Sequence, residues 1–157
     1  MSKELTIEAP DGVPFIDFTR EFDAPVERVF QAHADPDLVK QWNGPQGYEM
    51  DIAEHDFTTG GRYRYVHRDT QGNEYGFRGV FHTVRENEFV IQTFEYAGAP
   101  DEVSIETLTF ESLPDGRTRL KGHATYPSIE DRDAIVSSGM EHGMRDGYDK
   151  LEALVAA

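Results

Sequence analysis

The sequence contains no cysteine among its 157 residues. A disulfide framework, a thiolate metal site and a cysteine nucleophile are therefore excluded. The first ten residues, MSKELTIEAP, lack the apolar run of a signal peptide. No run of eighteen apolar residues occurs anywhere, so we expect no transmembrane helix and a cytoplasmic protein.

The fingerprints of common catalytic and nucleotide-binding sites are also missing. Neither a Gly-x-Ser-x-Gly motif nor a Walker or dinucleotide-binding motif occurs. No two of the six histidines have the i, i+4 spacing of a helical metal site. His67 and His82 fall in neighbouring predicted strands and could approach each other, but two solvated histidines explain the pattern better. We expect no metal or cofactor, and we assign no catalytic residue.

Basic residues are scarce relative to acidic ones. Thirty Asp and Glu residues oppose fifteen Lys and Arg residues, which gives a formal net charge of −15. Such a charge repels phosphate backbones and anionic lipids, so nucleic acid and membrane surfaces are not expected as partners. The charge is typical of a solubilising surface, and a cationic partner surface remains the alternative.

The N-terminal part of the chain predicts an arm, one strand and two short helices. Residues 1–14 are polar, end in a Pro- and Gly-containing segment, and predict a flexible arm. Apolar residues alternate over Phe15–Phe22, which is typical of a strand. Pro25 suits the first turn of a helix, and a second short helix is expected from Asp37 to about Trp42. Residues 15–157 are expected to form a single domain.

The middle of the chain predicts strands joined by short turns. The predicted strands are 48–57, 62–67, 75–84, 89–96, 103–113 and 118–126. Turns this short require antiparallel pairing. Together with the first strand, these segments predict a sheet of about seven strands that is large enough to curve strongly.

The C-terminal part predicts one long helix from Ser128 to about Val155. Ser128, with Asp131 three residues later, resembles a capping motif. The apolar stripe of the predicted helix consists of Met140, Met144, Tyr148, Leu151 and Leu154. Glycines at positions 139, 143 and 147 form a groove on one helix face. The groove either packs closely on the sheet or, with the adaptable Met side chains, forms the wall of a cavity.

Several short motifs are spread over residues 15–156. They include REFDAP at 20–25, WNGP at 42–45, GGRY at 60–63, YPS at 126–128 and SGMEHG at 138–143. In these motifs the sequence resembles the START-like, or SRPBCC, superfamily. Within it, the sequence is most similar to the branch named after the heat-shock-protein-90 ATPase activator (Aha-type) domain. Asn43 stands where members often carry a second Trp, so a stacking role does not transfer to that position.

The resemblance implies an α+β helix-grip fold, similar to birch-pollen-allergen domains. In this fold a curved antiparallel sheet wraps around a long C-terminal helix and leaves an interior cavity. Members of the superfamily bind hydrophobic small molecules, cyclise polyketides or dock on chaperones. Because one fold carries many functions, the resemblance predicts the architecture more firmly than the activity.

Strand alternation predicts which side chains face the interior. In strand 103–113, Leu108 and Phe110 point inward and would carry Glu106 with them, whereas a bulge in the strand would turn Glu106 to the solvated face. Gln92 is placed inward in the same way by its own strand, whereas Arg78 is expected to face water. Burial in an apolar cavity would raise the pKa of Glu106, which suits either a ligand anchor or a proton-transfer group. The predicted cavity residues are Trp42, Phe81, Gln92, Phe94, Glu106, Tyr126, Met140, Gly143 and Met144.

Three functions follow from these observations. The first is a non-enzymatic domain that binds a hydrophobic small molecule in an internal cavity. The second is an enzyme of polyketide cyclase or hydrolase type that uses a cavity Glu or His as a base. The third is a chaperone-interaction module that resembles the heat-shock-protein-90 ATPase activator. The sequence leaves open whether the protein is a homodimer.

Overall fold

The computed structural model describes residues 4–156, so residues 1–3 of the predicted arm and residue 157 lie outside the described range. The strands are β1 (Thr6–Glu8), β2 (Phe15–Phe22), β3 (Glu49–His55), β4 (Arg62–Arg68), β5 (Glu74–Arg85), β6 (Phe89–Tyr96), β7 (Ser104–Ser112) and β8 (Thr118–Thr125). The helices are α1 (Val26–Ala34), α2 (Pro36–Trp42), α3 (Ile129–Ser137) and α4 (Met140–Val155).

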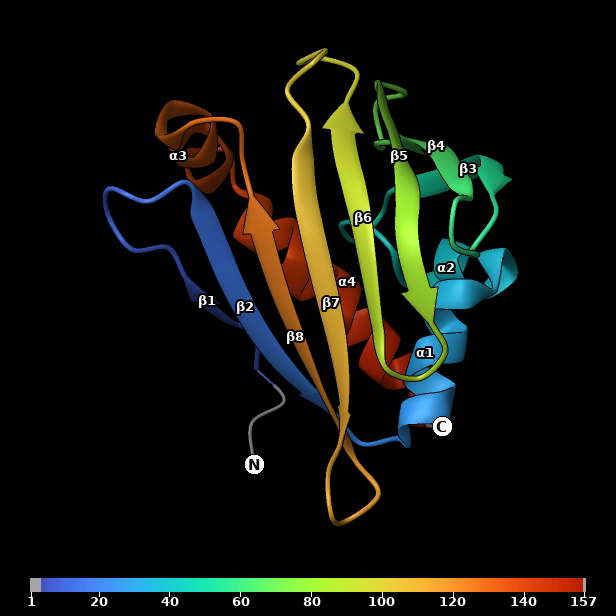
Figure 1. Cartoon of the computed structure of the whole chain (residues 1–157). Coiled ribbons are helices and arrows are strands. Elements are labelled where there is room, and N and C mark those ends of the chain that lie inside the picture. Colours follow the sequence, from blue (N-terminus) through green and yellow to red (C-terminus); the bar gives the residue numbers. More distant parts are fainter. Residues whose placement is uncertain (1–3, 157) are drawn as a thin grey trace.

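The eight strands form one antiparallel sheet in the order β1-β2-β8-β7-β6-β5-β4-β3. Figure 1 shows α4 lying behind this curved sheet. Helices α1 and α2 lie on the side of the sheet that β3, β4 and β5 form. Consecutive strands from β3 to β8 are neighbours because short turns join them. The α+β architecture of a curved sheet around a C-terminal helix, as predicted from the resemblance, is confirmed.

A strand lies inside the segment that was predicted to be a flexible arm. β1 pairs antiparallel with β2, with Thr6 opposite Thr19, and adds an eighth strand to the sheet. Leu5, immediately before it, is 5% exposed and packs in the core. A strand of three residues is too short to show the alternation from which strands are predicted.

The predicted C-terminal helix is two helices. Ser128 caps α3 as predicted, since its Oγ accepts a hydrogen bond from the amide of Asp131 at 3.1 Å. α3 then ends at Ser137, and Gly139 precedes α4 with a φ of 85°. This left-handed conformation interrupts the helix and is readily adopted only by glycine. Within residues 4–156, no helix is both long and apolar enough to cross a membrane.

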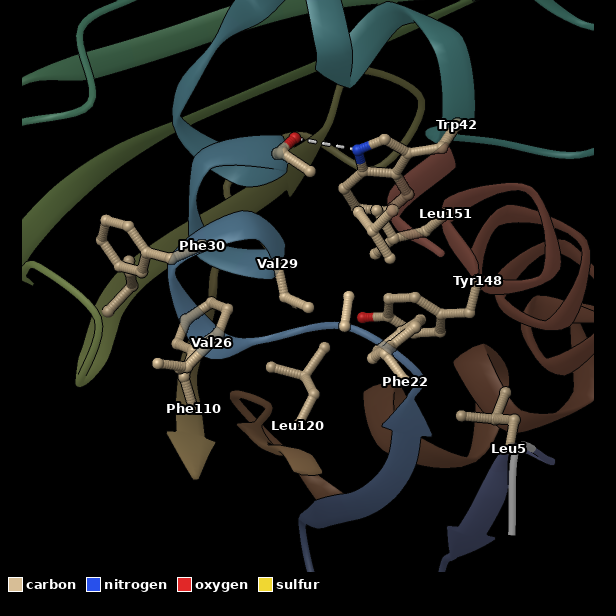
Figure 2. Packing of buried hydrophobic residues seen from close by; sticks show 14 of the residues in the cluster. Leu5, Phe22, Val26, Val29, Phe30, Trp42, Phe110, Leu120, Tyr148 and Leu151 are labelled. Carbon is tan, nitrogen blue, oxygen red and sulfur yellow. Dashed lines mark hydrogen bonds between the residues drawn. The ribbon is translucent and has the colours of Figure 1, made fainter. Parts of the chain in front are cut away.

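The hydrophobic core lies between α1, α4 and the sheet, where β2, β4, β5, β6, β7 and β8 each contribute a buried residue. Figure 2 shows Val29, Leu120 and Leu151 converging there with Tyr148 and Trp42. The ring of Trp42 stacks on Tyr148 at 5.8 Å between centroids, and its Nε1 donates to the carbonyl of Ala32 at 2.9 Å. Because its polar atom is bonded within the protein, Trp42 is a core residue that joins α2 to α4.

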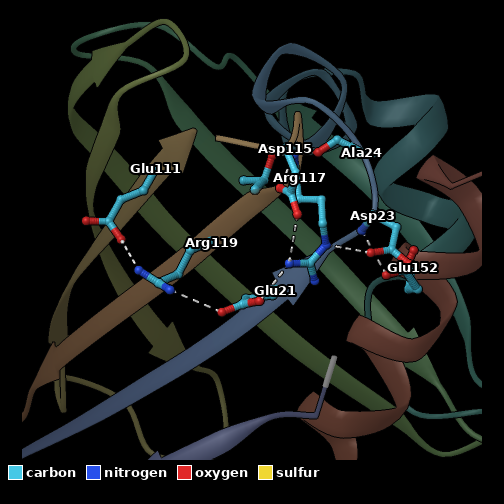
Figure 3. Close-up of polar contacts among 9 residues, drawn as sticks. Glu21, Asp23, Ala24, Glu111, Asp115, Arg117, Arg119 and Glu152 are labelled. Atoms are coloured by element: carbon cyan, nitrogen blue, oxygen red, sulfur yellow. Dashed lines mark hydrogen bonds and ion pairs between the residues drawn. The ribbon is translucent and has the colours of Figure 1, made fainter. Parts of the chain in front are cut away.

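A buried charge cluster joins β2 to β8 beside this core (Figure 3). The guanidinium of Arg117 donates to Glu21 at 2.9 Å and to Asp23 at 2.7 Å. Arg119 pairs with the second oxygen of Glu21 at 3.2 Å. Hydrogen bonds from Arg117 and Arg119 lower the pKa of Glu21, although partial burial opposes them. The Asp23 amide donates to Glu152 at 3.1 Å, which extends the cluster to α4.

Candidate functional site

Glu106 and Gln92 lie side by side on the concave face of the sheet. The register of β6 and β7 places the two residues opposite each other. The Gln92 Nε2 donates to the Glu106 Oε1 at 2.9 Å. Val90 and Phe110, which have the same strand parity, are buried in the core. Both polar side chains therefore point to the face that α4 covers, as the alternation of the strands predicts.

The carboxyl group of Glu106 lies in a desolvated environment. Burial raises its pKa above the usual value, and the hydrogen bond from Gln92 opposes this with a smaller effect. In the described part of the chain, no lysine, arginine or histidine forms a hydrogen bond or ion pair with it. Glu106 nevertheless retains part of its accessible surface.

The charge of Glu106 acts on the pKa of four tyrosines. They are Tyr63 and Tyr65 of β4, Tyr126 after β8, and Tyr148 of α4. Burial and the charge of Glu106 both raise the pKa of each of them. The raised pKa values keep all four tyrosines in the neutral form at pH 7.

Tyr63 reaches the site by crossing a neighbouring strand. Its hydroxyl donates to the carbonyl of Thr93 at 2.6 Å, next to Gln92. On the way its ring lies over Gly79, where an added Cβ would be 2.4 Å from the ring. Any other residue at position 79 would displace the ring, so this glycine is needed to position Tyr63.

An aromatic row continues from the site toward the β4–β5 end of the sheet. Phe77 stands in the middle of the row, with ring centroids 5.4 Å from Phe94 and 5.2 Å from Tyr65. Beyond Phe77 lies a pocket of about 190 Å³, lined by Pro45, Tyr48, His67, Tyr75 and Phe77. The row and the pocket give this half of the inner face an aromatic and mainly apolar surface.

His67 is the polar group of this pocket. Burial, with a smaller contribution from Lys150, lowers the pKa of His67 to about 4, so the ring is neutral at pH 7. Its Nε2 is buried without a hydrogen-bond partner and lies close to Gly44. His82, in contrast, is exposed and bonded to Thr83. The two histidines do not converge, and no cluster of three metal-binding side chains exists within residues 4–156.

The glycine groove of the C-terminal helix is filled by the protein itself. A Cβ on Gly147 would lie 3.2 Å from the carbonyl of Trp42, and one on Gly143 would lie 3.4 Å from Pro45. Gly139 is outside the helix. The interpretation of the groove as a cavity wall is therefore wrong, because the segment after α2 packs against it. What could not be read from the sequence is which distant segment would fill the groove.

The predicted cavity residues fall into two groups. Trp42 and Phe81 are 7% and 2% exposed and belong to the core. The partly accessible group consists of Gln92, Phe94, Glu106, Tyr126, Met140, Gly143 and Met144. None of the nine lines the pocket beside His67, nor a larger pocket of about 480 Å³ between α1 and the β5–β6 turn. Arg78 faces water as expected, where it pairs with Glu95 at 2.9 Å.

Two of the tyrosines near Glu106 were not singled out from the sequence. Tyr63 and Tyr65 alternate with Arg62 and Arg64, which indicates a strand with an aromatic face and a charged face. This signal was available. The effect of Glu106 on the pKa of these two tyrosines could not be predicted from the sequence, because it depends on how strongly the sheet curves between β4 and β7.

Comparisons with known proteins agree with this architecture. The family model described as "Activator of Hsp90 ATPase homolog 1-like protein" matches residues 23–156. A crystal structure of a Rhodobacter sphaeroides protein is similar with a TM-score of 0.89 and 25% identity, covering 98% of both chains. A Mycobacterium smegmatis protein has a TM-score of 0.86 and 26% identity, covering 97% of this chain and 96% of its own. A Chromobacterium violaceum protein has a TM-score of 0.79 and 27% identity, covering 91% and 98%. No curated protein matches the chain.

Proposed function

The chain belongs to the Activator of Hsp90 ATPase homolog 1-like protein family, and from the chemistry of its inner face we propose that it binds a small, mainly apolar molecule. The bound molecule lies between the concave face of the sheet and α4. The observation that carries the proposal is Glu106, a desolvated yet partly accessible carboxyl group whose only hydrogen-bond partner within residues 4–156 is Gln92. A side chain in this state is typical of a polar anchor in an otherwise apolar site.

The surroundings of Glu106 suit an apolar ligand. Phe94, Leu108 and Met144 are only partly buried and pack against the edge of the core cluster. Partly exposed apolar side chains on an inward face leave hydrophobic surface that a ligand covers with a gain in free energy, about 25 cal/mol per Å². Met144 adapts to different ligand shapes because its side chain is unbranched and flexible. One polar pair in an apolar lining fixes the orientation of the molecule.

Filling the space beside Glu106 tests the proposal. Ala124 of β8 lies opposite Glu106 in the register and is buried on the same face. We expect Ala124→Leu to remove ligand binding while leaving the free energy of unfolding within about 1 kcal/mol of wild type, because the added methyl groups occupy free space. Ligands are identified by thermal-shift screening of hydrophobic compounds, since a molecule that binds only the folded state raises the midpoint.

Ala53→Leu is the matched control, because Ala53 is an exposed alanine in a strand of the same sheet. It should leave both binding and stability unchanged. Two results contradict the proposal: no compound raises the midpoint of wild type, or Ala124→Leu costs about 1–3 kcal/mol, as overpacking of a filled core does. Mass spectrometry of the recovered compound distinguishes binding from chemical conversion.

A further inference from the structure

The pocket beside His67 is a second space for a ligand, and Glu106 does not line it. Its volume is about 190 Å³, and its walls come from three segments: Pro45 and Tyr48 between α2 and β3, His67 on β4, and Tyr75 with Phe77 on β5. An apolar cavity of about 150 Å³ in another protein binds benzene. The pocket beside His67 therefore has room for one six-membered ring with a small substituent.

Aromatic rings form most of the pocket wall and contact one another in two ways. The rings of Tyr48 and Tyr75 are stacked, with centroids 6.3 Å apart and planes at 23°. The ring of His67 is edge-on to Tyr48, at 6.3 Å and 87°, and to Phe77, at 5.3 Å and 60°. Stacked and edge-to-face contacts stabilise aromatic pairs beyond the burial of their apolar area. A planar ring can extend these contacts, which an alkyl chain of the same size cannot do.

His67 brings an imidazole without any hydrogen bond to this wall. The residue is 7% exposed, and its Nε2 is fully buried against Gly44 without a partner. The Nδ1 also makes no hydrogen bond within residues 4–156, but it is not fully buried. The Nδ1 is therefore the nitrogen that stays accessible on a ring that lines the pocket. Because buried polar groups nearly always have a hydrogen-bond partner, this nitrogen points to a partner from outside the chain.

The walls of the pocket favour an uncharged ligand. Burial lowers the pKa of His67 to about 4, so its ring is neutral at pH 7. The hydroxyl of Tyr75 donates to Asp69 at 3.1 Å, and this hydrogen bond raises the pKa of Tyr75. Lys150 is not a lining residue and donates to the carbonyl of Pro45 at 3.4 Å. A charged group in the pocket would lose its hydration without gaining an opposite charge from the lining residues.

From these contacts we propose that the pocket binds a small phenol, a single uncharged aromatic ring whose hydroxyl group hydrogen-bonds to the Nδ1 of His67. A hydroxyl group both donates and accepts hydrogen bonds, so it suits either tautomer of the neutral imidazole. The aromatic ring of the ligand packs against Tyr48, Tyr75 and Phe77. The inference does not rest on the proposed function, because Glu106 is not part of this pocket.

The competing interpretation is that water satisfies His67 and that the pocket takes any apolar ring. Phenol, toluene and benzoate have nearly the same size and separate the two when they are titrated by NMR at pH 7.5. An apolar pocket without a hydrogen bond favours toluene, because phenol loses more hydration on entering it. We expect wild type to bind phenol at least as tightly as toluene, and not to bind benzoate. His67→Leu should lower the ratio of the phenol to the toluene binding constant about tenfold, because it removes both nitrogens.

His82→Leu is the matched control, because His82 is an exposed histidine on the neighbouring strand. It should keep the wild-type ratio, and so should Ala124→Leu, which fills the space beside Glu106. An unchanged ratio in His67→Leu overturns the proposal. Loss of phenol binding in Ala124→Leu also overturns it, because phenol then binds beside Glu106, as the proposed function would allow. Failure of wild type to bind phenol, or tighter binding of benzoate or toluene, overturns the phenol pocket and leaves the Glu106 site untouched.

A measurement on wild type keeps the test decisive if His67→Leu fails to fold. The nitrogen NMR chemical shifts of an imidazole change when its nitrogens form hydrogen bonds. We expect saturation with phenol to move the Nδ1 resonance of His67 much further than saturation with toluene does, because only phenol forms a hydrogen bond there. Equal shifts with the two probes contradict the hydrogen bond to His67.

Discussion

His33 shows how burial controls the charge of one residue. Its ring lies between Trp42 and Phe110, with centroids 4.9 and 5.1 Å away. The Nδ1 is hydrogen-bonded to the carbonyl of Val29 at 2.8 Å, while the Nε2 is buried without a partner. Burial is the main cause that lowers the pKa of His33 to about 4, and the nearby His55 adds to it. The ring has to stay neutral for the core to remain packed.

This burial predicts that His33 destabilises the fold in acid. The unfolded chain binds a proton at His33 below its ordinary pKa of 6.5, whereas the folded chain does so only below about 4. Stability is therefore unaffected by His33 above pH 6.5 and falls as the pH drops toward 4, by about 3 kcal/mol in total. Urea unfolding at pH 7.5 and pH 4.5 should show that His33→Asn loses the share of the difference that His33 causes, while the buried His67, whose pKa is also lowered to about 4, keeps its own share. The exposed His82→Asn should keep both shares, and equal pH dependence in both variants would refute the assignment.

Strand alternation gave the inward direction of Glu106 and Gln92, and the regular pairing of β6 with β7 excludes the bulge that would have reversed it. In each strand, large apolar residues such as Phe110 and Val90 have to be buried, and they determine which alternate residues face inward. Alternation describes one strand at a time, so it could not show that the charge of Glu106 acts on tyrosines of β4 and α4 and on Tyr126. For the two histidines the signal was available, because His67 has the parity of Tyr63 and Tyr65, whereas His82 follows the buried Phe81.

The break between α3 and α4 is the clearest difference between sequence and structure at the level of elements. A glycine in a helix costs only about 1 kcal/mol, so three glycines did not exclude a continuous helix. The backbone at Gly139 has a φ of 85°, whereas Gly143 is an ordinary helical position inside α4. Sequence does not distinguish these two states of glycine, because both satisfy the same spacing of apolar residues.

Two alanine substitutions with opposite expected effects test the break. Gly139→Ala should destabilise the protein by about 1 kcal/mol, because a Cβ is strained at positive φ although open space surrounds it. Gly143→Ala should stabilise it by up to about 1 kcal/mol, because its Cβ would make an ordinary contact with Pro45 in a regular helix. Urea unfolding measures both. If both variants were more stable, α3 and α4 would form the continuous helix that the sequence predicted.

At the scale of the whole molecule, the packing of side chains differs between the two ends of the sheet. The core and the Arg117 cluster occupy the end where β2 stops and β8 starts, and the Glu106 site lies toward the opposite end. The end that carries the core supplies stability from packed side chains. The other end keeps side chains partly accessible, which suits a ligand that completes the packing.

The net charge of −15 predicts a stability that rises with salt. Repulsion among the surface acids opposes the compact state, and salt screens it. Raising NaCl from about 0.01 to 1 M shortens the screening length from about 30 to about 3 Å. We expect the midpoint of urea unfolding to rise at pH 7.5 and to change little at pH 5, near the sequence isoelectric point of 4.6. A fall with salt at pH 7.5 would mean that ion pairs such as Arg117–Glu21 outweigh the repulsion.

The two outer strands of the sheet also affect how copies of the molecule meet. β1 is only three residues long, and β3 carries a bulge between Ile52 and Glu54 beside the exposed acids Glu49 and Asp51. Short, bulged or charged borders are the features by which proteins prevent strand addition from a neighbouring molecule. Aggregation through continuous sheets is therefore disfavoured even at high concentration. Any self-association of this protein has to use a surface other than the borders of its sheet.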